Sequence, residues 1–452
     1  MKTNFSILKL LFGLMLLTSA SMAQVQPKIQ YLRAYDKTGI NVFETPKTDT
    51  IPYEGLRIRF GAGFTQGYQS LSHSNGLSVS SPTKLYEMGG GFPLAQANFN
   101  IDVQLYDGVS LNLVSYMSSH HHNEFWVKGG YLQIDKVGFL KSEFFDKLWK
   151  NLTLKVGHME VNYGDAHFRR SDGGHTLWNP WIENNIMDAF TTEIGAELYW
   201  KKNGILLMGG YTDGEIQGNV ASPSTPIGGK RAPSLYAKIG IDKQLQEKLR
   251  VRVTASAVTT ESSISNTLYG GDRTGSNYQY VMENAPVTLT GNAFAGRFNP
   301  GFRDNLTSFV INPFVKFSGL EVFGTFEWAS GNSAFENGEG TTYAKQSDRK
   351  AQQTAIEALY RFGRNEQFYF GGRYISVNST IGEGYTATAV GTRYDITIDR
   401  TSIGGGWFIT QNILLKGEYV TQNYGGFKDT GANNRFYNGK FDGFVIQGAI
   451  SF

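Results

Sequence analysis

Apolar and polar residues alternate along most of this chain. In 440–452 (KFDGFVIQGAISF), Phe444 and Ile446 share one face of an extended strand, and Gln447 lies on the other. Residues 320–328 (LEVFGTFEW) repeat the pattern, with both glutamates on the face opposite the tryptophan. Successive side chains of a strand point to opposite faces, so a period of two predicts strands with one apolar and one polar face. The chain is therefore expected to be all-β.

The connectors between these strands alternate in length. Short turn-forming pairs such as 107–108 (Asp-Gly) alternate along the chain with long stretches such as 164–189 and 261–303. Residues 136–150 are an exception, because they form a long connector on the short side and can hold a helical turn. Sixteen strands are predicted near 55–68, 95–106, 109–119, 123–135, 151–163, 190–201, 204–213, 232–243, 248–260, 304–317, 319–330, 351–362, 367–378, 397–409, 412–424 and 440–452.

This arrangement is typical of a transmembrane β-barrel. Lipid cannot hydrogen-bond a bare backbone, so strands cross a bilayer only as a closed cylinder without edges. We therefore predict an antiparallel barrel of about 16 strands over 55–452, with short periplasmic turns and long extracellular loops. Aromatic residues near strand ends, among them Trp328, Trp407, Phe314 and Tyr424, are expected to form interfacial girdles. The soluble alternatives are a β-sandwich and a propeller, although no blade-length repeat is visible.

The first 23 residues have the pattern of a secretory signal peptide. Two lysines precede the apolar run 10–17, and the small residues of 21–23 predict cleavage before Gln24. Residues 24–54 are then a periplasmic N-terminal extension, which could dock inside the barrel mouth or bind a periplasmic partner. The chain has no cysteine, which excludes a disulfide scaffold, thiolate chemistry and a lipoprotein anchor.

The last strand ends in GAISF at 448–452. Here the chain resembles the outer-membrane porins of Gram-negative bacteria, whose final strand ends in an aromatic residue that the assembly machinery recognises. The resemblance implies a homotrimer in outer-membrane lipid that allows passive diffusion of small hydrophilic solutes and ions. It also implies that the third long loop, here 164–189, folds inward and narrows the pore. A weaker similarity to phosphate-selective porins rests on the paired arginines at 57, 59, 250 and 252, although acids are interleaved with the bases.

The alternation assigns nearly all strand charges to the interior, because an Arg or Lys that faces lipid near the midplane costs roughly 2–4 kcal/mol. Such a lumen is expected to be aqueous, since sixteen strands leave a channel. The inward cations are Arg57, Arg59, Lys128, Lys155, Lys238, Arg250, Arg252, Lys316, Arg361, Arg373 and Lys416. The inward anions are Asp102, Glu193, Glu197, Asp242, Glu321, Glu327, Glu357 and Glu418. The surplus of cations suggests a slight preference for anions, and the alternative is that the charges mainly pair across strands.

Within the barrel, loop 164–189 is the best candidate for a constriction. Its charged groups would give the pore its electric field, and Trp178 and Trp181 would anchor it to the wall. The alternative is an outward surface loop. The residues expected to line or constrict the pore are Arg57, Arg59, Arg169, Arg170, Asp172, Glu183, Arg250, Arg252, Arg361 and Arg373.

Metal binding, catalysis and nucleic-acid binding have less support in the sequence. The histidines 120–122 are of a metal-binding type, but neighbouring residues on a strand point to opposite faces, so no metal site or cofactor is predicted. His158 falls on an apolar face, and no spacing brings Ser118 or Ser119 to it, so no catalytic residue and no enzyme are predicted. The formal charge of +3 argues against nucleic-acid binding. Two further hypotheses are a barrel that binds or assembles with a polysaccharide or protein partner, and an outer-membrane enzyme.

Overall fold

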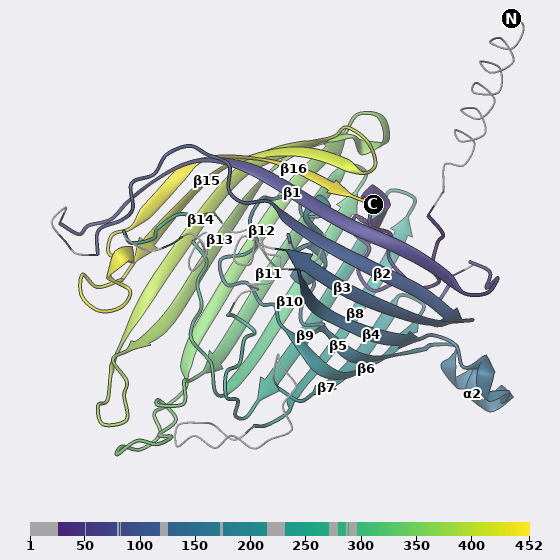
Figure 1. Cartoon of the computed structure of the whole chain (residues 1–452), viewed down its shortest axis with the longest axis horizontal. Helices are drawn as coiled ribbons and strands as arrows, with labels where there is room; N and C mark the ends of the chain where they lie inside the picture. The colour runs from purple at the N-terminus through teal and green to yellow at the C-terminus, as the bar shows by residue number, and fades with distance from the viewer. Residues whose placement is uncertain are drawn as a thin grey trace, which may run out of the picture.

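The protein is a closed antiparallel barrel of sixteen strands, as seen in a computed structural model (Figure 1). The structure describes residues 26–49, 51–78, 81, 83–117, 125–171, 175–214, 231–270, 279–285, 288 and 296–452. The predicted signal peptide and the histidines at 120–122 lie outside these residues. Each strand pairs with its neighbours in sequence, and β1 closes the barrel by pairing with β16.

The strands are β1 (Arg57–Ser74), β2 (Gln96–Tyr106), β3 (Val109–Met117), β4 (Trp126–Ile134), β5 (Leu152–Glu160), β6 (Thr192–Lys202), β7 (Ile205–Thr212), β8 (Ser234–Gln246), β9 (Leu249–Thr260), β10 (Leu306–Phe317), β11 (Leu320–Gly331), β12 (Arg349–Phe362), β13 (Phe368–Glu383), β14 (Thr392–Phe408), β15 (Ile413–Gly425) and β16 (Lys440–Ser451). One α-helix, α2 (Glu143–Trp149), lies between β4 and β5. The 3-10 helices are η1 (Lys37–Gly39), η2 (Gly138–Leu140), η3 (Ala166–Arg169), η4 (His175–Leu177), η5 (Arg364–Glu366) and η6 (Asn434–Phe436). Within the described part of the chain, no helix is long and apolar enough to cross a bilayer.

The predicted fold class is confirmed, and all sixteen predicted strands are present. The strands β1, β13 and β14 extend several residues further toward the long loops than predicted. Their outward side chains there are polar, as at Ser70 and Ser72, so the apolar alternation stops while backbone pairing continues. The helical turn expected within 136–150 is α2.

The short connectors have the backbone geometry that hairpins require. Between β6 and β7, Asn203 has a φ of 51° and Gly204 a φ of 78°. Positive φ at both central residues defines a type I′ turn, whose twist matches that of the flanking strands.

The outer wall is apolar, and it is bordered by aromatic rings. The Phe368 ring lies 5.7 Å from that of Phe362 and 6.1 Å from that of Trp407 at the turn side. The expectation that Phe314 and Tyr424 belong to the girdles is wrong, because both side chains are buried inside the barrel. Both rings pack against interior aromatic partners contributed by chain outside the strands, and a period-two pattern contains no information about such partners.

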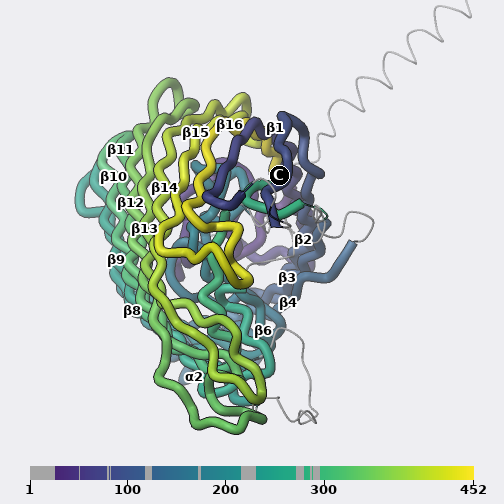
Figure 2. Tube along the Cα trace, turned by 90° about the vertical axis from the view of Figure 1, so that its left-hand side faces the viewer, coloured from purple at the N-terminus to yellow at the C-terminus, as the bar shows by residue number. Residues whose placement is uncertain are grey.

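The interior is packed with chain, whereas an open water column was expected. Figure 2 shows the N-terminal part of the chain, in purple, inside the ring of strands. Toward the long loops, inward side chains such as Ile375 and Ile398 form one apolar core with Ile186 and Met187 of loop 164–189. The faces of the strands are therefore as predicted, but the lumen that they enclose is largely filled.

The position of the membrane along the outer wall can be tested with two arginine substitutions at different depths. Ile356 points outward near the middle of β12, while Gln352 lies level with the girdle residue Trp328. We expect Ile356→Arg to lower the free energy of unfolding by about 2–4 kcal/mol, and Gln352→Arg by at most about 1 kcal/mol, because the cost of a charge falls toward the interface. Guanidinium unfolding from phospholipid vesicles measures both, and equal costs would contradict this placement of the membrane.

Candidate functional site

Residues 26–49, here called the N-terminal segment, run through the turn-side half of the barrel. The Arg33 guanidinium lies 3.4 Å from the centre of a Trp178 ring, and the Asn41 amide donates to Glu321 Oε1 on β11 at 2.7 Å. The segment is thus held to both the wall and loop 164–189. That it lies on the periplasmic side of the membrane stays a prediction.

Loop 164–189 is described over 164–171 and 175–189, here called the inner loop, and these residues cross the interior and pack on the far wall. The ammonium of Lys416 on β15 donates to the carbonyl oxygens of Thr176 and Asn179, each at 3.0 Å, and of Trp181 at 2.7 Å. Trp178 and Trp181 are both buried. The loop therefore lies inside the barrel rather than over its surface, and its role in conduction stays a prediction.

A first charge cluster joins the N-terminal segment, the inner loop and the wall. Arg252 on β9 contacts Asp165 Oδ2 at 2.8 Å and Glu44 Oε2 at 2.5 Å, and Lys238 on β8 lies 3.1 Å from both acids. All four side chains are almost fully buried. Burial alone would raise the pKa of each carboxyl, but Arg252 and Lys238 hold the pKa of Glu44 well below its usual range and also lower that of Asp165.

A second charge cluster lies where the inner loop meets β13, β14 and β15. Glu418 accepts from the backbone N–H of Ile182 at 2.6 Å and contacts Arg373 at 3.2 Å. Glu183 lies 3.1 Å from Arg400 Nη2. Burial raises the pKa of Glu183 to about 7, assisted by Glu418 and opposed by Arg400 and Arg373.

The other predicted site residues are also paired. The pairs are Arg59 with Asp102 (2.6 Å), Arg250 with Asp242 (2.7 Å), Arg361 with Glu321 (2.9 Å), Arg169 with Glu357 (2.5 Å) and Arg170 with Asp188 (2.6 Å). Arg57 stands apart at the turn end, where it contacts Glu54. Asp172 lies outside the described residues. The structure thus groups the predicted residues in several charge clusters and does not gather them in one ring.

The sequence reasoning missed several residues of these clusters. Arg400 is buried on the inner face of β14, two residues from the inward Ser402, so the alternation could have identified it. Glu44 and Arg33 precede the first strand, and no local pattern marks them as interior residues.

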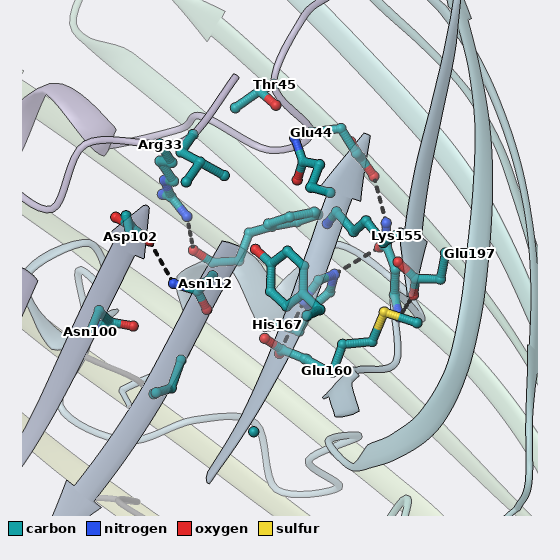
Figure 3. Close-up of a pocket in the computed structure, with 18 of the residues that line it drawn as sticks. Arg33, Glu44, Thr45, Asn100, Asp102, Asn112, Lys155, Glu160, His167 and Glu197 are labelled. Carbon is teal, nitrogen blue, oxygen red and sulfur yellow. Dashed lines mark hydrogen bonds and ion pairs between the residues drawn. The ribbon is translucent and has the colours of Figure 1, made fainter. Parts of the chain in front are cut away.

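A cavity of about 220 Å³ lies between the N-terminal segment, the inner loop and strands β1 to β6 (Figure 3). Its walls are rich in aromatic rings, and the Lys155 ammonium lies 5.2 Å from the ring centres of Tyr131 and Tyr199. Among the described residues Lys155 makes no hydrogen bond, whereas the lining acid Asp102 accepts from Arg59 and Asn112. The cavity has room for several waters or one small solute.

A second cavity, of about 690 Å³, opens at the turn side. Phe43, Glu44 and Lys201 line both cavities. The N-terminal segment therefore contributes to the partition between the inner cavity and the turn-side mouth.

Histidine and acidic side chains are the candidates for metal or catalytic chemistry in this chain. His158 shares a hydrogen bond with Thr192 on the neighbouring strand at 3.0 Å, which provides a polar partner for a histidine on an apolar face. The described residues contain no group of three or more His, Asp or Glu side chains placed to hold a metal ion. The histidines at 120–122 and the serines at 118 and 119 lie outside those residues.

Comparisons with known proteins relate the chain to others through its fold. No protein-family model matches it, and no curated protein sequence does. The outer membrane channel DcaP of Acinetobacter baumannii superposes with a TM-score of 0.50 at 9% identity, covering 89% of this chain and 99% of that one. The anion-selective porin from Comamonas acidovorans gives 0.49 at 9% identity, with 88% and 100% covered, and OmpT of Vibrio cholerae gives 0.45 at 10%, with 89% and 99% covered.

The apolar exterior and the edge-free closure identify a barrel that spans a membrane, and barrels of this type belong to the outer membrane of Gram-negative cells. With sixteen antiparallel strands, an apolar exterior and inward-facing charges, this chain has the fold of the Gram-negative outer-membrane porins.

Proposed function

We propose that the protein is an outer-membrane porin for the passive diffusion of small hydrophilic solutes. The observation that carries the proposal is the solute-sized cavity, which is lined by charged side chains of the inner wall such as Arg59, Asp102 and Lys155. A barrel whose only task was to stay folded would not need these charges, because burying ions costs desolvation energy. The predicted pore-lining arginines and Glu183 belong to this wall and to the inner loop. Catalysis is not part of the proposal.

The proposed path is narrow, because the N-terminal segment and the inner loop occupy most of the interior. Solutes would pass beside the segment, between the turn-side mouth and the inner cavity. A slight preference for anions is part of the proposal and is supported by Lys155, which reaches the cavity without a hydrogen-bonded partner among the described residues. A homotrimer is also proposed, from the resemblance to porins alone.

The filled interior favours one second candidate function. A barrel with a packed lumen could serve as a membrane anchor that binds or assembles with a polysaccharide or protein partner. Planar-bilayer recording separates the two candidates: a protein that inserts without passing ions, and that copurifies with a partner, would reject the porin.

Two arginines of the inner loop provide the first test. Arg169 and Arg170 are buried and paired with Glu357 and Asp188, so removing both leaves Glu357 without its cation and Asp188 with Arg297 alone, at 3.6 Å. We expect Arg169→Ala plus Arg170→Ala to shift the reversal potential in a salt gradient toward cation preference. Arg364→Ala, in an exposed turn, is the matched control. An unchanged potential in the double variant would remove the inner loop from the conduction path.

The second test concerns the N-terminal segment. A 2.9 Å backbone hydrogen bond from Lys37 to Gln411 places these residues within reach of an engineered disulfide, and the chain has no other cysteine. We expect a variant without residues 26–49 to conduct severalfold more than the intact protein. The variant Lys37→Cys plus Gln411→Cys, with its disulfide oxidised, should have the same low conductance as the intact protein. The same sample after reduction of the disulfide is its control. Equal conductance with and without the segment would show that it does not narrow the path.

The third test uses pH. Because the pKa of Glu183 is raised to about 7, this carboxyl is mostly neutral at pH 6 and mostly charged at pH 8. The added negative charge should move the reversal potential toward cations as the pH rises through 7. We expect Glu183→Gln to reduce that shift, while Glu366→Gln, at the turn side, should leave it unchanged. A shift of the same size in Glu183→Gln would assign it to another group.

A further inference from the structure

The connector 136–150 between β4 and β5 differs from the hairpin turns around it. It contains η2 and α2, and Figure 1 shows α2 lying clear of the strands at the edge of the barrel. The helix is seven residues long and has no buried residue. An isolated helix shorter than about 12 residues is marginal in water, so this one needs a surface to pack on.

The helix has one strongly apolar face that nothing in the described chain covers. Phe144, Phe145 and Leu148 are spaced to lie on one side of a helix, and they are 69%, 40% and 47% exposed. Asp146 lies on the opposite side. Exposed apolar faces of this kind mark a site of interaction with a membrane or a protein.

The apolar face continues the lipid-facing wall of the barrel. The Phe139 ring of η2 packs edge-on against Tyr106 at the end of β2, with their centres 6.3 Å apart, and Tyr106 is itself outward and exposed. The Trp149 indole donates to the Ile134 carbonyl at 3.2 Å, which ties the end of the helix to β4. The connector is thus fixed at the turn-side rim, level with the end of the outer wall.

The charges of the connector complement those of phospholipid headgroups. Residues 136–150 include four lysines and two acids. Lys141 and Lys150 flank the helix at its two ends, and both are exposed. Lysines beside an apolar helix face are typical of helices that lie in the interface of an anionic membrane.

We propose that the connector 136–150 is a phospholipid-binding surface, which lies on the turn-side leaflet with its phenylalanines among the acyl chains and its lysines at anionic headgroup phosphates. The apolar face of this surface is separate from the proposed conduction path, and Lys150 at its end also lines the turn-side cavity. The other occupant that would fit an apolar face is a second copy of the chain, and the experiment distinguishes it.

The absence of cysteine makes single-site labelling direct. Phe144→Cys and Asp146→Cys, each with a nitroxide label, are reconstituted in vesicles of phosphatidylethanolamine and phosphatidylglycerol. We expect oxygen, which partitions into lipid, to relax the label at 144 more strongly than a water-soluble nickel chelate, and the reverse at 146. Equal access of the chelate to both labels would overturn the proposal. Protection of 144 from both reagents, with spin–spin broadening between chains, would also overturn it and assign the face to a second copy.

The lipid class is tested in the same samples. Replacing phosphatidylglycerol by phosphatidylcholine should reduce the depth of the label at 144. The triple change Lys141→Gln, Lys147→Gln and Lys150→Gln should make that depth independent of the lipid. A depth that does not depend on lipid charge in the chain with all its lysines would overturn the headgroup part of the proposal.

Discussion

A bilayer cannot hydrogen-bond a peptide group, and this constraint determines the rest of the structure. Each spanning strand must therefore have a partner on both sides, and the ladder from Gly63–Ser451 to Ser74–Lys440 between β1 and β16 removes the last two edges. A closed wall has only two faces, so each strand residue points either to lipid or to the interior. The alternation of the sequence, the apolar exterior and the inward charges are all consequences of that choice.

Charges that point into a filled interior must then find partners. Wall cations such as Arg252 and Lys238 are neutralised by Glu44 and Asp165, which come from the N-terminal segment and the inner loop. Removing one partner of a buried pair typically costs about 3–5 kcal/mol, because it leaves an uncompensated charge. The wall and the chain that fills it are therefore one electrostatic unit, and the segment contributes to the fold as well as to the path proposed for solutes.

The parts of this structure that follow from local spacing could be predicted, and the parts that depend on distant contacts could not. The period-two pattern identified all sixteen strands and the inward positions of Arg59 and Glu357. It could not pair Glu44 with Arg252, which lies 208 residues away in the sequence. For the same reason Phe314 was expected in a girdle, whereas its ring packs on Phe43 of the N-terminal segment. The candidate site was thus predicted as a set of residues but not as a set of contacts.

In the proposed porin, this pairing changes the origin of selectivity. A surplus of cations in an open lumen would attract any anion through a long-range field, which salt would screen within about 10 Å. Here most wall cations already hold a carboxylate of the chain, so an entering anion has to compete with groups such as Glu44 for Arg252. A neutral hydrophilic solute faces no such competition and needs only room beside the segment. Selectivity in this barrel would then depend on the exchange of partners at a few buried cations more than on the net charge of its wall.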